Sequence, residues 1–85
     1  MKKKLIIITS FEKNLGYGNL NRSYNFYNYT KKKIGSSKIY VKTSFKNFFL
    51  LKKKYKDIYF FKLSSLEKDK KYFDIIESRL NSTNI

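Results

Sequence analysis

Apolar positions along the first half of the chain alternate between short continuous runs and a helical stripe. Residues 5–9 (Leu-Ile-Ile-Ile-Thr) are apolar without polar alternation, which predicts a strand buried on both faces. Two glycines in residues 14–18 then predict a turn. Four apolar residues at helical spacing predict a helix over about 20–33 that ends near Gly35. This stripe comprises Leu20, Tyr24, Tyr27 and Ile34.

The second half of the chain shows two further strand patterns and a second helical stripe. Residues 38–43, where Ile39 and Val41 alternate with polar neighbours, and residues 57–63, rich in aromatic and β-branched types, each predict a strand. Ser64 and Glu67 have the spacing of a capping box, which predicts the start of a last helix. Its apolar face comprises Leu66, Phe73, Ile76 and Leu80. Residues 81–85 are expected to be a frayed end.

The segment over residues 44–56 fits either a short helix or an extended basic hairpin arm, and periodicity does not decide between them. The order strand, helix, strand, basic segment, strand, helix is typical of a split β-α-β unit that lacks its last strand. We therefore expect residues 1–85 to form one domain of the α+β class. The expected fold is a ferredoxin-like split β-α-β sandwich (β-α-β-β-α), with a small antiparallel sheet and two helices.

The charge of the chain narrows the possible partners. The 85 residues carry a formal net charge of +14, and residues 1–56 hold all the excess, with fifteen Lys or Arg against the single acid Glu12. Charge this dense favours a polyanionic partner, nucleic acid first and an acidic membrane surface second. The longest apolar runs are four residues, against about 20 for a membrane span, so no membrane association is predicted.

The residue types that carry most enzyme chemistry are missing. Cysteine and histidine do not occur, which excludes disulfides, thiolate chemistry, the usual zinc sites and imidazole bases. The few acids form no pair of the kind that acid–base catalysis uses. The sequence therefore predicts neither an enzyme nor a small-molecule substrate, and no cofactor or metal.

Lysines and aromatic residues alternate through residues 45–56, a pattern typical of RNA contact, because lysines neutralise phosphates and aromatic rings stack on bases. The alternative is an amphipathic helix whose Phe48, Leu51 and Tyr55 fill the core while its lysines face water. On the first interpretation the RNA-binding residues are Arg22, Lys31, Lys32, Lys33, Lys42, Lys46, Lys52, Lys53, Lys54 and Lys56.

Three segments resemble the small-ribosomal-subunit protein ten family. Residues 8–12 (Ile-Thr-Ser-Phe-Glu) match the end of its first strand, residues 30–35 (Thr-Lys-Lys-Lys-Ile-Gly) the close of its helix, and residues 40–44 (Tyr-Val-Lys-Thr-Ser) its next strand. Phe45 and Lys46 stand where the family has Pro and His. The resemblance implies a ferredoxin-like domain that contacts rRNA and neighbouring ribosomal proteins in the small subunit.

The composition adds an expectation about location. Alanine and proline are absent and valine occurs once, while Lys, Asn, Ile, Phe and Tyr are abundant. This bias is typical of very AT-rich genomes, including those of reduced organelles, whose remaining soluble products are mostly ribosomal proteins. Together with the first resemblance, it favours a structural protein of an organellar ribosome, located in the mitochondrion.

A second resemblance competes with the first. Residues 16–23 (Gly-Tyr-Gly-Asn-Leu-Asn-Arg-Ser) are similar to the Gly-x-Gly-His-x-x-Arg turn of sugar-nucleotide hydrolases and related glycosyltransferases, with Asn19 in place of the His. This resemblance implies the N-terminal part of a Rossmann-like enzyme, with a parallel sheet and a helix over residues 45–56. A simple turn at the two glycines is the plainer alternative, and Asn21 replaces the third glycine of a dinucleotide fingerprint. Strand direction distinguishes the two resemblances.

Overall fold

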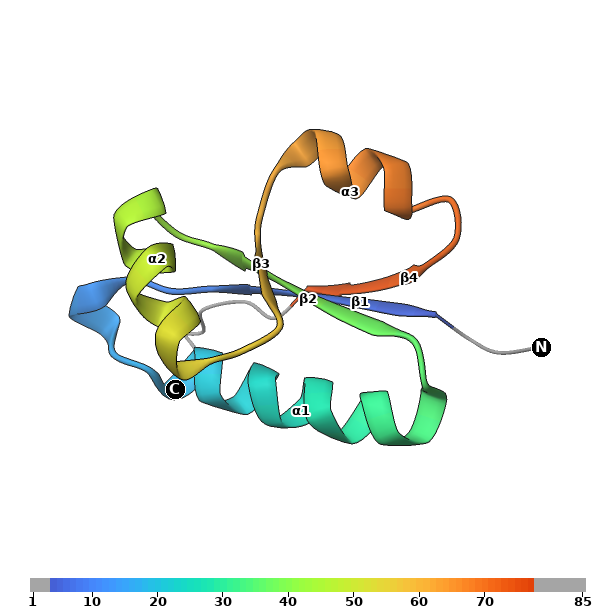
Figure 1. Cartoon of the computed structure of the whole chain (residues 1–85), viewed down its shortest axis with the longest axis horizontal. Coiled ribbons are helices and arrows are strands. Elements are labelled where there is room, and N and C mark those ends of the chain that lie inside the picture. The colour runs from blue at the N-terminus through green and yellow to red at the C-terminus, as the bar shows by residue number, and fades with distance from the viewer. Residues whose placement is uncertain (1–3, 78–85) are drawn as a thin grey trace, which may run out of the picture.

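The computed structural model describes residues 4–77. Strands and helices alternate throughout this range, with a short 3-10 turn, Lys13–Leu15, after the first strand (Figure 1). The strands are β1 (Leu5–Ser10), β2 (Ser37–Lys42), β3 (Ile58–Phe60) and β4 (Asp74–Glu77). The helices are α1 (Gly18–Ile34), α2 (Phe45–Lys54) and α3 (Leu63–Asp69).

Within residues 4–77 the four strands form one parallel sheet in the order β3-β2-β1-β4. The predicted antiparallel sheet of a ferredoxin-like α+β fold is therefore wrong, and the domain is α/β. The reason lies between β2 and β3, where the chain forms a helix instead of a hairpin arm. A hairpin would return β3 antiparallel to β2, whereas the helical connection lets β3 enter the sheet in the same direction.

The last part of the chain also differs from the prediction. The predicted helix from Ser64 begins one residue earlier and ends at Asp69, and residues 74–77 form β4. Ser64 lies inside α3 and therefore does not act as the predicted cap. The residue that precedes the helix is Lys62, whose side chain forms no capping hydrogen bond. β4 pairs with β1 from Leu5↔Asp74 onward, which supplies partners to an otherwise unpaired edge of β1. Leu80 and residues 81–85 lie outside the described residues.

Helices cover both faces of the sheet, as α1 and α3 show on opposite sides in Figure 1. One face packs against α1 and α2 in a cluster that includes Ile7, Leu20 and Ile39, all at most 1% exposed. The other face has a smaller cluster of Ile6, Ile8 and Tyr40, against which Leu66 of α3 packs. β1 is thus the central strand of the core, in agreement with its predicted burial on both faces.

The helix α1 confirms the predicted stripe. Leu20 and Tyr27 are buried and Ile34 packs against the same cluster. The helix ends at Gly35, whose φ of 88° is left-handed and whose N–H donates to the carbonyl of Lys31 at 3.0 Å. Three lysines in the last turn suit the negative end of the helix dipole.

Asp69 attaches α3 to the sheet. Its Oδ2 accepts hydrogen bonds from the Tyr40 hydroxyl at 2.6 Å and from Lys38 Nζ at 3.0 Å. The hydrogen bond from Tyr40 and the nearby Lys38 hold the pKa of Asp69 below its usual range. In turn, burial and the bond to Asp69 raise the pKa of Tyr40 far above its usual range. The ionised carboxylate is therefore the form that stabilises this face.

We predict that Asp69→Asn lowers the free energy of unfolding by about 1 kcal/mol at pH 7. The pKa of Asp69 is depressed in the folded state, so its contribution is full above the ordinary value of 3.8 and is lost as pH falls further. Urea denaturation at pH 7 and near pH 3 measures the difference between the two proteins, which should shrink in acid. Glu67→Gln, at an exposed carboxylate of the same helix, is the control. A difference independent of pH would contradict the assignment.

Candidate functional site

The order of the strands places a candidate site at the carboxyl ends of β1 and its neighbours. From β1 the chain continues to β2 on one side, and after β3 it crosses the sheet through α3 to reach β4 on the other side of β1. The first four strands of the doubly wound nucleotide-binding fold have the same order. In such sheets ligands bind outside the carboxyl ends of the strands, where the connections leave in opposite directions.

The loop between β1 and α1 folds back on itself at this edge. Glu12 and Gly16 form an antiparallel bridge around the 3-10 turn, and Gly16 has a left-handed φ of 78°. The rings of Phe11 and Tyr17 lie 5.0 Å apart and close the loop against the core. α1 then begins at Gly18, where no side chain of the described residues caps it. Its positive end therefore lies at the carboxyl edge of the sheet.

Two cations lie beside the start of α1. A Cβ atom placed on Gly18 would be 4.0 Å from Nη1 of Arg22, so the guanidinium group lies against the first turn of the helix. From α2, Lys54 brings its Nζ to 5.1 Å from the centre of the Tyr17 ring. The helix start, the guanidinium and the ammonium together favour an anion such as a phosphate.

A pocket of about 540 Å³ opens next to this loop, at the ends of β1 and β2. Its lining residues are Ser10, Phe11, Glu12, Lys13, Lys42, Thr43, Ser44 and Asn47. The Oγ1 atom of Thr43 is buried and has no hydrogen-bond partner among the described residues. The Ser44 hydroxyl is already used, because it accepts from the Asn47 backbone N–H at 3.2 Å and caps α2. Thr43 and Lys13 are therefore the polar groups of the pocket best suited to a ligand.

Asn19 occupies the position where the sugar-nucleotide enzymes have His. Asn19 is only 8% exposed, and its Nδ2 donates to Thr9 Oγ1 at 3.0 Å and to the Ser10 carbonyl at 3.3 Å. These bonds fix the start of α1 to the end of β1. A carboxamide does not accept a proton as an imidazole does, so Asn19 positions the turn and does not act as a general base.

The ten predicted RNA-binding residues lie on α1, at the end of β2, and on α2 or just after it. Arg22 lies near the start of α1, whereas Lys31, Lys32 and Lys33 lie in its last turn, about 15 Å further along the axis. Lys42 ends β2, where its Nζ pairs with Glu77 at 2.8 Å. The other predicted residues lie on α2 or just after it: Lys46, Lys52, Lys53, Lys54 and Lys56.

Most of the segment over residues 44–56 is helical, because it contains α2. Phe48, Leu51 and Tyr55 are buried, as the amphipathic-helix interpretation predicts, and the extended hairpin arm is wrong. Phe49 and Leu50 remain 63% and 55% exposed. Exposed Lys46 and Lys53 share this part of the helix, and Lys53 Nζ lies 6.0 Å from the centre of the Phe49 ring. We call the side of α2 with Lys46, Phe49, Leu50 and Lys53 its outer face.

Sequence analysis does not single out Lys13 or Thr43. Thr43 directly follows β2 and Lys13 lies in the loop after β1, at the carboxyl edge where ligands of parallel sheets bind. In the expected antiparallel sheet, the ends of strands share no carboxyl edge. A position after a strand therefore indicates a ligand site only once the strands are known to be parallel.

Within residues 4–77, no three His, Cys, Asp or Glu side chains gather to hold a metal ion. In the same range no helix is long and apolar enough to cross a bilayer.

Comparison of the chain with protein-family models, with curated proteins and with solved structures finds no match.

We predict that Asn19→Ala lowers the free energy of unfolding by about 1–3 kcal/mol, because the buried Thr9 hydroxyl and the Ser10 carbonyl lose the Nδ2 donor. Urea denaturation followed by circular dichroism measures this loss. Asn25→Ala, at an exposed position of the same helix, is the matched control and should change stability by a few tenths of a kcal/mol at most. Equal effects of the two variants would contradict the structural role of Asn19.

Proposed function

We propose that the protein binds a phosphate-bearing ligand of the sugar-nucleotide class at the carboxyl edge of its parallel sheet. The single observation that carries the proposal is the turn from β1 into α1, where the Arg22 guanidinium lies against Gly18 at the start of the helix. The same residues carry the resemblance to sugar-nucleotide hydrolases and related glycosyltransferases. The domain would correspond to the N-terminal part of such an enzyme.

The chemistry of this edge suits a diphosphate. The start of α1 offers the positive end of a helix dipole, and Arg22 can donate two parallel hydrogen bonds to phosphate oxygens. Lys13 in the adjacent pocket and Lys54 beside Tyr17 add two further positive charges. In the same pocket, the buried Thr43 hydroxyl has no hydrogen-bond partner among the described residues.

The proposal is one of binding without the hydrolysis that the related enzymes perform. Their turn contains a His, and an imidazole can take a proton near neutral pH. Here Asn19 takes that position and donates its amide hydrogens to Thr9 and Ser10. Among the described residues of the pocket, the acid is Glu12, a single carboxylate near the start of the loop.

The test is isothermal titration with UDP and a UDP-sugar. We expect Arg22→Gln to weaken the binding of both about tenfold or more, because a charge-assisted contact to phosphate is lost. Arg22→Lys should give a smaller loss, since an ammonium keeps the charge but not the paired donors. Lys33→Gln removes the same charge from the far end of α1 and serves as the control. Equal affinity of Arg22→Gln and the unaltered protein would refute the proposal.

We propose RNA binding as a second function, because the outer face of α2 presents exposed apolar and aromatic residues beside lysines. Lys46 and Lys53 would neutralise phosphates, and Phe49 would stack on a base. In this form the protein would be a constituent of a ribonucleoprotein such as the small subunit of a mitochondrial ribosome, with rRNA and ribosomal proteins as neighbours. The proposal depends on this surface and not on the fold that the ribosomal resemblance implied, which the parallel sheet contradicts.

The salt dependence of RNA binding tests this second function. Replacing both Lys46 and Lys53 with Ala should lower the slope of log affinity against log salt by up to about two charge equivalents. Filter binding of a single-stranded RNA between about 50 and 200 mM salt measures the slope. The control replaces Lys70 and Lys71, which changes the net charge by the same amount in the last third of the chain. Equal slopes for the two double variants would exclude the outer face of α2 from the interface.

A further inference from the structure

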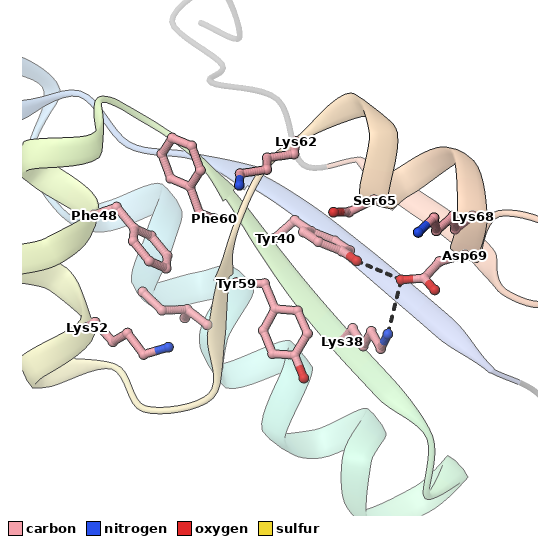
Figure 2. Close-up of a pocket in the computed structure, with 11 residues that line it drawn as sticks. Lys38, Tyr40, Phe48, Lys52, Tyr59, Phe60, Lys62, Ser65, Lys68 and Asp69 are labelled. Atoms are coloured by element: carbon pink, nitrogen blue, oxygen red, sulfur yellow. Dashed lines mark hydrogen bonds and ion pairs between the residues drawn. The ribbon is translucent and has the colours of Figure 1, made fainter.

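A second pocket, of about 490 Å³, lies at the opposite edge of the sheet from β4, around the strand β3 (Figure 2). Among the described residues β3 pairs with β2 alone, so its other side is open. The helix α2 borders the pocket on one side and α3 on the other. We call it the β3 pocket, and we call the pocket at the ends of β1 and β2 the carboxyl-edge pocket. The two pockets share no lining residue.

Positive charge dominates the β3 pocket. Its lysines come from four different parts of the chain: Lys38 from β2, Lys52 from α2, Lys62 from the loop after β3, and Lys68 from α3. The one acid of the lining is Asp69, whose Oδ2 is engaged by Lys38 Nζ and by the Tyr40 hydroxyl. Lys52, Lys62 and Lys68 form no salt bridge within residues 4–77.

Such an arrangement differs from an ordinary solvated face. Lysines along one exposed helix face water on a convex surface, whereas these three come from different elements that border one concavity (Figure 2). Like charges facing one space repel each other, and a bound anion removes that repulsion. Three ammonium groups around one pocket match the two or more charges of a pyrophosphate group. The Ser65 hydroxyl on α3 adds a neutral donor in the same lining.

An aromatic ring accompanies the lysines. Tyr59 on β3 is 44% exposed and lines the β3 pocket. Tyr40 meets its ring edge-on, with centroids 5.6 Å apart, and Lys38 Nζ lies 5.6 Å from its centre. These contacts hold the ring in place while part of its surface is open. An exposed, fixed aromatic ring beside phosphate-binding lysines suits the base of a nucleotide.

We propose that the β3 pocket is a second ligand site, which binds a nucleotide with its phosphates among Lys52, Lys62 and Lys68 and its base against Tyr59. The ligand chemistry is the same whether the nucleotide is free or part of an RNA strand. The site is independent of the carboxyl-edge pocket and requires neither the glycine turn nor Arg22.

Two probes separate the two parts of the site: pyrophosphate, which has no base, and ADP. Replacing both Lys62 and Lys68 with Gln should weaken the binding of each probe about tenfold or more. Tyr59→Leu should weaken ADP about fivefold or more and leave pyrophosphate unchanged, because only ADP has a base to stack. The control replaces Lys70 and Lys71 with Gln, which removes two charges outside the pocket. Both exposed pairs are expected to leave the fold intact, as circular dichroism checks.

The position of bound ligand is read from amide chemical shifts in NMR spectra of the full chain. Binding in the β3 pocket moves the amides of Tyr59, Lys62 and Ser65, whereas binding at the carboxyl edge moves those of Gly16 and Gly18. Arg22→Gln should leave the first set of shifts unchanged, so failure of the Proposed function and failure of this site are distinguishable. Comparison of ADP with a short oligoadenylate at equal ionic strength distinguishes the two sources, since an RNA site predicts that the oligoadenylate loses as much affinity on Tyr59→Leu as ADP does, and a site for the free nucleotide predicts that only ADP does.

Three results would overturn the proposal. The first is an equal loss of affinity in the Lys70 and Lys71 control, which would show general attraction of anions to a basic protein. The second is unchanged affinity for both probes when Lys62 and Lys68 are replaced. The third is ligand-induced shifts confined to the amides of the carboxyl edge.

Discussion

The buried backbone of β1 is the constraint on which the rest of the structure depends. Ile6 and Ile7 are at most 1% exposed, so the strand is covered on both faces, and its N–H and C=O groups need partners on both edges. β2 supplies the partners on one edge. The other edge is paired by β4, after the chain has crossed the sheet through α3. That crossing also covers Ile6 and Ile8, so one connection meets both requirements.

The candidate sites follow from the same constraint. The connection from β1 leads through α1 to β2 on one side, and β4 reaches the other side of β1 from β3, so the loop after β1 turns at the carboxyl edge and presents the start of α1 there. The β3 pocket arises because the crossing begins at an edge strand, so that α2 and α3 stand on either side of β3. Each site therefore combines residues distant in sequence, such as Lys52 with Lys68.

Local patterns predict β1, α1 and β2 closely, because burial on both faces and a helical stripe are properties of neighbouring residues. Strand direction is not such a property, since residues 38–43 alternate in the same way in parallel and antiparallel sheets. The strand β4 is not predictable from local pattern either. Phe73 and Ile76 fit a helical stripe that begins at Leu66, and only the unpaired edge of β1 favours a strand there. Among candidate residues, the spacing of Gly16, Gly18 and Arg22 indicates a candidate site from the sequence alone. Lys62, Lys68 and Tyr59 come together only through the topology of the fold.

The net charge of +14 connects the sites to the stability of the fold. A domain of this size has a small core, and mutual repulsion of its lysines opposes compaction. The structure relieves part of this repulsion by pairing Lys31, Lys38 and Lys42 with acids, but Lys52, Lys62 and Lys68 of the β3 pocket form no salt bridge among the described residues. An anion that binds the folded state alone stabilises it by about 2.7 kcal/mol at a hundred times its dissociation constant. Such a gain is a large part of the stability of a small domain, so an anionic ligand would be a structural component of this protein as well as its partner.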